Sequence, residues 1–141
     1  MPHRIEQVTD ESTEGRATAA VSRMLLHYNV RETRVSDYQS LTLVLRDEQE
    51  EIVGGLVGET FYGWLFVKTL VLEQALRRQS FGSQLLARAE AIGRERGCAH
   101  AYLDTFSFQA LPFYEKRGYS RFGTLEDFPP GQSRYFLQKK L

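Results

Sequence analysis

The sequence predicts a mixed α/β fold, with a central, mostly antiparallel sheet, a parallel β-α-β core and flanking helices. The order of the apolar patterns carries this prediction, because three extended segments in a row precede alternating helices and strands. The strand, helix and strand between Trp64 and Thr105 form a unit whose strands pair in parallel through a right-handed crossover. The other strands form a meander and a closing hairpin, so we expect antiparallel pairing there.

The N-terminal part is expected to hold a short first strand at His3–Val8 and then a helix. Asp10 is suited to cap that helix, which is predicted to run to about His27 and to end at Asn29. Its apolar residues recur at helical spacing and are Ala17, Ala20, Val21, Met24, Leu25 and Tyr28. The polar stretch Val30–Tyr38 is predicted as a loop or a short broken helix.

Three strands are predicted next. Leucines alternate with other residues in Leu41–Leu45, and the acidic stretch Asp47–Glu51 is typical of a turn. Ile52–Tyr62 is predicted as a strand although it contains three glycines, which indicate a bend, a bulge or a close backbone approach. Trp64–Leu72 is the strand that delivers the chain into the central loop.

The stretch Leu70–Gly97 is predicted as the end of a strand, an arginine-containing loop and a helix that stops at Gly97. Its helical face consists of Phe81, Leu85, Leu86, Ala89 and Ile92. A helix N-terminus presents unpaired N–H groups and about half a positive charge, which suits phosphate oxygens. Gly82 should permit close approach of a ligand. Many α/β proteins carry such a unit without a ligand, and neither a P-loop nor a dinucleotide motif is present.

The C-terminal part is predicted to begin with a buried strand, Ala99–Thr105. Pro112 has to lie in the first turn of the following helix, which we place at about Gln109–Arg117 with Gly118 as its cap. The closing hairpin then consists of two strands and a proline-rich turn, which are Tyr119–Leu125, Pro129–Gly131 and Ser133–Lys140.

Length and composition limit the remaining classes. At 141 residues we expect one domain, 1–141, and the balance of 18 basic and 18 acidic residues argues against broad nucleic-acid binding. The single cysteine, Cys98, allows no internal disulfide, and the three histidines show no metal-binding spacing, so no metal is expected. No apolar run approaches the ~18 residues of a membrane span and no signal peptide is visible, so a cytoplasmic protein without membrane partners is expected.

Two motifs resemble those of the GNAT superfamily of N-acetyltransferases. Arg77-Arg78-Gln79-Ser80-Phe81-Gly82 resembles the acetyl-CoA-binding motif Arg/Gln-x-x-Gly-x-Gly/Ala, with Ser80 in place of the first glycine. Serine takes a positive φ less cheaply than glycine. The segment Ser107–Tyr119 resembles the family's Asn-x-x-Ala-x-x-Phe-Tyr-x-x-x-Gly-Phe/Tyr, with Ser107 in place of asparagine. The resemblance covers the chain from about Leu41 onward and implies the acyl-CoA N-acyltransferase fold.

The resemblance implies that acetyl-CoA donates an acetyl group to a primary amine, which belongs to a small molecule or a peptide. The pantetheine arm is expected to lie along Leu70–Leu72, in a gap where this strand diverges from Tyr102–Thr105. The cofactor-binding residues implied are Leu70, Val71, Leu72, Arg77, Arg78, Gln79, Ser80, Phe81, Gly82, Ser83, Ser107 and Tyr114. A homodimer is compatible with the family. By the same resemblance, Val30–Tyr38, Tyr62–Trp64 and Leu125–Gln132 are expected to line the acceptor entrance.

Tyr114 occupies the motif position of the family's general acid. A tyrosine keeps its proton at pH 7, because its ordinary pKa is about 10, and it can serve a departing thiolate. Glu59, Asp104 or a water molecule remains open as the base, while Lys68 either pairs with an acidic group or faces the acceptor. A non-catalytic acyl-CoA-binding domain and a nucleotide-binding module are the alternative functions.

Overall fold

The computed structural model describes residues 2–141. Two compact units divide the chain, the first ending at Ser36 and the second spanning Asp37–Leu141. The first unit contains the helix α1, Glu11–Thr33, whose N-terminus is capped as predicted: the Asp10 carboxylate accepts a hydrogen bond of 2.9 Å from the backbone N–H of Thr13.

Two predictions for the first unit are wrong. Residues 3–8 form no strand, because an extended segment needs a partner for its backbone groups and this unit offers none. The helix continues past Asn29 to Thr33, because no glycine or proline interrupts this stretch. It ends where Arg34 adopts a left-handed conformation with φ 61°.

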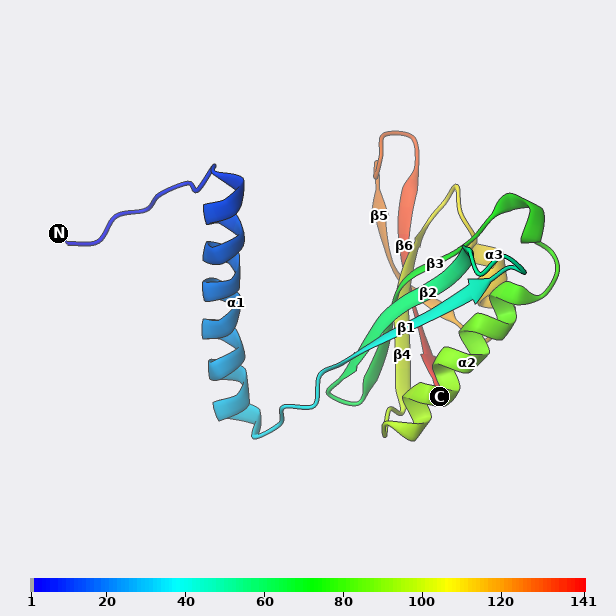
Figure 1. The fold of residues 1–141 in the computed structure, drawn as a ribbon, viewed down its shortest axis with the longest axis horizontal. Helices are drawn as coiled ribbons and strands as arrows, with labels where there is room; N and C mark the ends of the chain where they lie inside the picture. The colour runs from blue at the N-terminus through cyan, green and yellow to red at the C-terminus, as the bar shows by residue number, and fades with distance from the viewer. Residues whose placement is uncertain (1) are drawn as a thin grey trace. The chain divides into compact units, whose positions relative to one another are not determined.

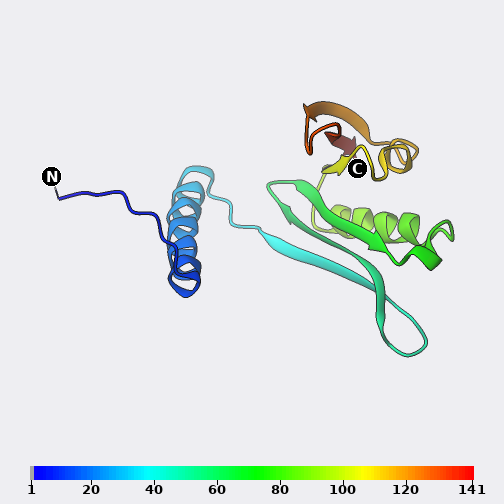
Figure 2. The ribbon, with the colours of Figure 1, turned by 90° about the horizontal axis from the view of Figure 1, so that it is seen from above.

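The second unit is a six-stranded sheet in the order β1-β2-β3-β4-β6-β5, with α2 lying along one face (Figures 1 and 2). β3 and β4 pair in parallel and all other neighbours are antiparallel, as predicted. The strands are β1 (Gln39–Arg46), β2 (Ile52–Phe61), β3 (Trp64–Leu72), β4 (His100–Phe106), β5 (Ser120–Glu126) and β6 (Ser133–Lys140). The helices are the 3₁₀ turn η1 (Gln74–Leu76), α2 (Phe81–Glu95) and α3 (Leu111–Glu115).

The predicted bounds of the strands hold to within two residues at nearly every end, whereas α3 is shorter than predicted. Pro112 does lie in its first turn, and Gly118 takes a φ of 92° beyond its end. The helix begins only at Leu111, because the Gln109 side chain accepts a 2.8 Å hydrogen bond from the backbone N–H of Phe106 and so closes the preceding turn.

The core lies between the sheet and the face of α2 predicted to be apolar. Its buried members are Leu41, Leu56, Leu65, Val67, Leu86, Ala89, Ala101, Leu103, Tyr114, Tyr119 and Leu137. A polar network absent from the sequence predictions joins three elements at its edge. The buried carboxylate of Glu90 on α2 pairs with Lys139 at 2.9 Å and accepts a 2.7 Å hydrogen bond from the Tyr119 hydroxyl. Burial raises the pKa of Tyr119, and the hydrogen bond to this carboxylate raises it further.

Among residues 2–141, the model contains no helix long and apolar enough to cross a membrane.

Candidate active site

A gap opens between β3 and β4 at the centre of the sheet. The two strands pair only from Trp64, opposite His100, to Val67, opposite Leu103. β3 then continues to Leu72 and β4 to Phe106 without further pairing. The facing backbone groups of the two strands are therefore free to bind an extended ligand.

A β-bulge on the other side of β3 coincides with the start of this gap. In the pairing with β2, Gly58 lies opposite Val67 and Val57 lies opposite Thr69, so Lys68 is the extra residue. A bulge bends its strand and increases the local twist, which explains why β3 diverges from β4 here. A Cβ atom on Gly58 would lie 2.3 Å from the carbonyl oxygen of Phe66, so the bulge requires glycine at this position.

The loop after β3 leads into the N-terminus of α2. Ser80, the residue before α2, has a φ of 67° and makes no side-chain capping bond. The backbone N–H of Gln84 and the hydroxyl of Ser83 both donate to the Ser80 carbonyl, at 3.0 and 2.8 Å. The first-turn N–H groups of Phe81–Ser83 precede the first intrahelical donor and remain available to an anion.

Ser80 thus adopts the left-handed conformation that favours the glycine usual at this motif position. Arg78 also has a positive φ, 66°, which the sequence did not indicate. Each costs about 1–2 kcal/mol relative to a right-handed conformation, so the tertiary structure must hold the loop in this shape.

Gly82 does not have the positive φ that would favour glycine, since it lies in the first helical turn. A Cβ atom there would lie 3.4 Å from the ring of Phe113 on α3 and 3.7 Å from Leu72. The absence of a side chain at this position therefore lets α3 and the end of β3 lie close to the N-terminus of α2.

The positive charge of the loop comes from Arg77 and Arg78, whose side chains are exposed. Neither arginine takes part in the ion pairs found within residues 2–141, so both charges can act on an anion at the start of α2. Gln79 donates instead to the carbonyl oxygen of Ala75 at 2.9 Å, which stabilises the loop.

Tyr114 on α3 is 7% exposed and contacts the rings of Phe113 and Tyr119, with centroids 5.1 and 6.0 Å away. Burial, together with the negative charge of Asp104, raises the pKa of Tyr114 to about 12. The hydroxyl therefore keeps its proton at any physiological pH. Its neighbour Phe113 lies beside Gly82, where an added Cβ would be 3.4 Å from the ring, and the charge of Asp104 acts on Tyr114, so Tyr114 lies near both the start of α2 and β4.

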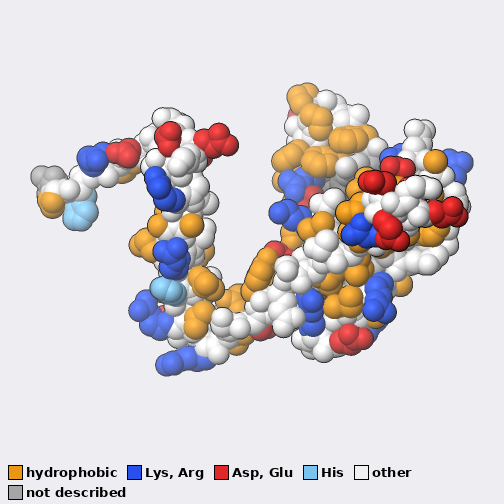
Figure 3. Space-filling view, in the orientation of Figure 1, with side chains coloured by type: hydrophobic (Ala, Val, Ile, Leu, Met, Phe, Trp, Pro, Cys, Tyr) orange, Lys and Arg blue, Asp and Glu red, His pale blue; other side chains and the backbone are white. Residues whose placement is uncertain are grey.

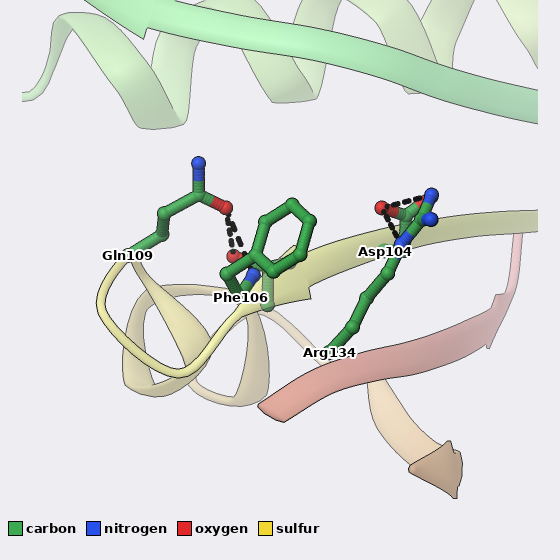
Figure 4. Close-up of polar contacts among 5 residues, drawn as sticks. Asp104, Phe106, Gln109 and Arg134 are labelled. Atoms are coloured by element: carbon green, nitrogen blue, oxygen red, sulfur yellow. Dashed lines mark hydrogen bonds and ion pairs between the residues drawn. The ribbon is translucent and has the colours of Figure 1, made fainter. Parts of the chain in front are cut away.

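Asp104 is the first residue of β4 beyond the paired segment. Its Oδ1 atom accepts a hydrogen bond of 2.8 Å from Nε of Arg134 on β6 and forms an ion pair with a terminal nitrogen of the same guanidinium, also at 2.8 Å (Figure 4). Glu59, the other candidate base, accepts a 2.8 Å hydrogen bond from the Tyr38 hydroxyl. Lys68 is exposed and takes part in none of the ion pairs among residues 2–141.

Two further predicted residues lie in clearly defined surroundings. The Ser107 hydroxyl donates to the side-chain oxygen of Gln132 at 2.6 Å and accepts from the backbone N–H of Ser133 at 2.9 Å, so it joins the end of β4 to the β5–β6 turn. Cys98 lies before the start of β4, at the end opposite the gap, and burial raises the pKa of its thiol.

Two surface hollows flank α2. One, of about 580 Å³, is lined in part by Ser83, Gln84, Lys116 and Arg117. The other, of about 660 Å³, lies on the other side near Glu73, Leu76 and Phe81. Both adjoin the first turn or two of α2, and neither is lined by residues of the gap.

Sequence reasoning missed an aromatic cluster beside Asp104. Phe106 stacks on Phe108 at 5.3 Å and contacts Phe128 at 5.4 Å. The Arg134 guanidinium lies 5.5 and 5.1 Å from the rings of Phe106 and Phe128. The alternation of β4 could have placed Phe106 and Asp104 on one face, but only the register of β6 brings Arg134 to them.

Comparison of the chain with known proteins identifies its family. The model of the acetyltransferase (GNAT) family matches residues 5–119, most of the chain. The chain belongs to the GNAT acetyltransferase family. An acetyltransferase from Agrobacterium fabrum is 37% identical over 133 residues, which are 94% of this chain and 97% of that protein. The GNAT fold and an acyltransferase activity predicted from the two motifs are thereby confirmed.

Two other GNAT relatives extend the comparison. The blasticidin-S acetyltransferase of Streptomyces morookaense is 41% identical over 95 residues, which are 67% of this chain and 70% of that protein. The crystal structure of an acetyltransferase from Bacillus cereus superposes with a TM-score of 0.84 at 34% identity, covering 99% of this chain and 98% of that one. The individual binding residues of the GNAT motifs stay predictions.

Proposed function

We propose that the chain transfers the acetyl group of acetyl-CoA to a primary amine by direct attack of the amine on the thioester. The observation that carries this proposal is the gap between β3 and β4, which opens at Lys68 and extends to Leu72, beside Gly82 in the first turn of α2. One end of the site offers free helix N–H groups and two arginines for phosphates. The other offers strand backbone groups for an amide-containing arm.

The described residues fit acetyl-CoA. The pyrophosphate is proposed to bind the first turn of α2, Phe81–Ser83, with Arg77, Arg78 and Gln79 around it. The pantetheine arm, which carries two amides, would pair with those backbone groups of Leu70–Leu72 that face the gap rather than β2. Such pairing resembles the addition of a strand to a sheet, so its affinity would come from backbone hydrogen bonds and depend little on side chains.

In the proposed reaction, the nitrogen of a neutral amine forms a bond to the thioester carbon, and the carbon–sulfur bond breaks. Backbone N–H groups of β3 donate to the carbonyl oxygen as it gains negative charge. The thiolate leaves with a hydrogen bond or proton from Tyr114, whose raised pKa keeps it protonated. The proton that the amine loses passes to a base, for which Glu59, Asp104 and water remain the candidates.

Asp104 has a structural argument in its favour. It lies at the mouth of the gap, and its pairing with Arg134 fixes its orientation (Figure 4). Because Arg134 already engages Oδ1 of this carboxylate, we assign Asp104 to orienting the amine. We propose that Asp104 orients the amine and that a water molecule takes up its proton. Glu59 is the alternative proton acceptor.

The test measures release of the coenzyme A thiol from acetyl-CoA in the presence of primary amines, with mass spectrometry of the products. The panel includes blasticidin S, simple arylalkylamines and alkylamines, and a peptide with a free amino group. We expect thiol release that depends on an amine, together with an acetylated product. Stabilisation against heat by acetyl-CoA without release for any amine would contradict the proposal and favour a non-catalytic binding domain.

A control distinguishes a nucleotide-binding module. Acetyl-CoA and ATP share the adenosine phosphates but differ in the pantetheine arm. Binding to the native state alone stabilises it by about 2.7 kcal/mol at a ligand concentration of one hundred times the dissociation constant. We expect a larger rise in melting temperature with acetyl-CoA, whereas an equal rise with ATP would show that the gap does not bind the arm.

A further inference from the structure

The two faces of β4 differ in a way that assigns directions to the two substrates. Ala101, Leu103 and Thr105 are buried, and the first two belong to the core that packs against α2. The alternate residues Asp104 and Phe106 are half-buried on the opposite face. The helix N-terminus and the arginine loop lie on the face of the sheet that α2 covers, so we expect the cofactor to bind from that face. The acceptor is therefore left with the face that carries Asp104 and Phe106.

Phe106 on that face is the centre of the aromatic cluster, in which the other two rings are open to solvent. Phe108 is 59% exposed and Phe128 is 40% exposed. The planes of Phe106 and Phe108 are within 18° of parallel. Hydrophobic side chains also gather over the β5–β6 hairpin in the space-filling view (Figure 3). Three exposed or half-exposed rings beside a reaction centre suggest a binding surface rather than a core.

Several contacts hold these rings in place without a ligand. The Arg134 guanidinium lies 5.1–5.5 Å from the rings of Phe106, Phe128 and Phe136. Ser107 joins the end of β4 to Gln132 and Ser133, and Phe128 donates its backbone N–H to the Gln132 carbonyl at 3.1 Å. The rings need little rearrangement to bind, which reduces the entropic cost of binding.

Asp104 adds a polar anchor within reach of the same surface. Two residues of an extended strand span about 6.6 Å, so its carboxylate lies next to the Phe106 ring. Arg134 directs both its Nε hydrogen bond and its terminal-nitrogen ion pair to Oδ1. No hydrogen bond to Oδ2 is found within residues 2–141, so this oxygen can accept from an amine.

We propose that the acceptor is a primary amine attached to a flat, unsaturated body, which stacks on the surface formed by Phe106, Phe108 and Phe128 while Asp104 binds the amino group. This inference rests on the proposed function and adds the chemical class of the acceptor. A saturated body of equal size would bury similar apolar area. A planar π-system would also gain the stacking interaction of aromatic pairs, worth about 2- to 10-fold in affinity.

The experiment compares 2-phenylethylamine with 2-cyclohexylethylamine, which have the same carbon skeleton and differ in the flatness of the ring. KM values for both amines are measured at saturating acetyl-CoA for the wild-type chain, Phe108→Leu, Phe128→Leu and Phe122→Leu. Leucine keeps an apolar side chain and removes the ring. Phe122 is a matched control because it is 56% exposed and contacts only Phe136 among the rings of the second unit, at 6.4 Å.

We expect the wild-type KM to be about 2- to 10-fold lower for 2-phenylethylamine. Phe108→Leu and Phe128→Leu should bring the ratio of the two KM values toward one, whereas Phe122→Leu should leave it at the wild-type value. Comparing ratios between variants removes the difference in basicity between the amines. Melting temperatures establish that each variant is folded.

Equal wild-type KM values, an unchanged ratio in both Phe108→Leu and Phe128→Leu, or acetylation of other amines but neither of these two would overturn this inference and leave the proposed function standing. Failure to acetylate any amine of the panel would overturn the proposed function, and this inference with it.

Discussion

The two sides of the gap between β3 and β4 use different parts of the chain. On the side of α2, backbone groups dominate: free N–H groups at Phe81–Ser83, a loop with Ser80 at positive φ, and the unpaired edge of β3. On the opposite side, side chains dominate, namely three phenylalanine rings, the Asp104 carboxylate and the Arg134 guanidinium. Backbone groups can bind a cofactor that all members of the family share, whereas side chains can change with the acceptor.

This difference also explains which side is recognisable in the sequence. A backbone site needs particular residues only where a conformation or a close approach demands them, as at Gly58, and these leave short motifs. The aromatic side is assembled from the end of β4, the β5–β6 turn and β6, which are far apart in sequence. No local pattern predicts that assembly.

The largest effect is expected from Gly58→Ala, which would destroy the gap that both sides share. The added Cβ would lie 2.3 Å from the Phe66 carbonyl oxygen, so the bulge at Lys68 must rearrange. We expect a loss of about 3 kcal/mol or more in the free energy of unfolding and loss of acetyl-CoA binding. Chemical denaturation measures the first quantity and calorimetric titration the second.

Gly15→Ala is the matched control, because nothing lies within 4 Å of a Cβ at this position in α1. It should be neutral or stabilise by roughly 0.5–1 kcal/mol. Equal effects of the two substitutions would show that the glycine of the bulge has no special role.

The next largest effect is expected from Tyr114→Phe, which keeps the ring and removes the hydroxyl. General acid catalysis typically contributes about 10²–10⁴-fold, and we expect the low end of this range because a thiolate is a weak base. Acetyl-CoA affinity should stay nearly constant. Single-turnover kinetics is the appropriate measurement, since product release can mask a slower chemical step.

Tyr119→Phe serves as the control, because it removes the hydrogen bond to Glu90 without touching the gap. It should lower stability and leave the single-turnover rate unchanged. A Tyr114→Phe rate equal to that of the wild type would remove this hydroxyl from the mechanism.

The raised pKa of Tyr114 also predicts a dependence on pH. Its pKa is about 12 in the folded chain against 10.0 ordinarily, so the folded state favours the neutral form. Its contribution to stability is therefore complete below pH 10 and is lost as the pH rises toward 12. The wild type should lose stability more steeply than Tyr114→Phe between pH 10 and 12, as measured by chemical denaturation, and parallel curves would contradict the shift.

A smaller effect, confined to the acceptor side, is expected from Arg134→Gln. It removes the cation between the rings of Phe106 and Phe128 and releases Asp104 from its ion pair. We expect the KM for the amine to rise about 5- to 10-fold, because Asp104 and the rings lose the group that orients them. This change corresponds to about 1–1.4 kcal/mol, the net contribution of one ordinary hydrogen bond, and the dissociation constant of acetyl-CoA should stay constant. An equal rise in the KM for the amine and in the dissociation constant of acetyl-CoA would mean that the acceptor side and the cofactor side do not bind their ligands independently.

The smallest effect is expected from Ser80→Gly on the cofactor side. Glycine adopts the φ of 67° without strain, so the substitution should preserve acetyl-CoA affinity and stabilise the fold by up to about 1 kcal/mol.

Gly82→Val is the contrasting substitution in the same loop. It should weaken acetyl-CoA binding strongly, because its side chain would meet Phe113 and Leu72 where α2 begins. Calorimetric affinities in the opposite order would show that the loop is assigned in the wrong register.

Much of the fold could be predicted from the sequence because its signals are local. The bounds of β3 and β6 match the predicted ones, Asp10 caps the start of α1 as expected, and Gly97 and Gly118 take positive φ values beyond the ends of α2 and α3. The sequence predictions were wrong where a tertiary interaction determines whether an element forms or how long it is. A first strand at residues 3–8 lacks a partner within its unit, and α3 is short because Gln109 bonds to the preceding turn.

In the candidate site, too, local features could be predicted from the sequence and those that depend on tertiary pairing could not. The divergence of β3 from β4 agrees with the expectation, and Ser80 adopts the conformation for which the motif uses glycine. The pairing of Asp104 with Arg134 could not be foreseen, since it depends on the register of β6 against β4. The single domain 1–141 and the binding roles of individual residues stay predictions.

Backbone N–H groups of β3 and of the first turn of α2 are proposed to bind acetyl-CoA. Hydrogen exchange of the backbone amides, with and without acetyl-CoA, measures this binding directly. We expect slower exchange at Leu70, Leu72 and Phe81–Ser83 when acetyl-CoA is bound, with little change at Phe108 and Phe128. Protection of the aromatic side, or no protection at Leu70 and Leu72, would contradict the proposed binding.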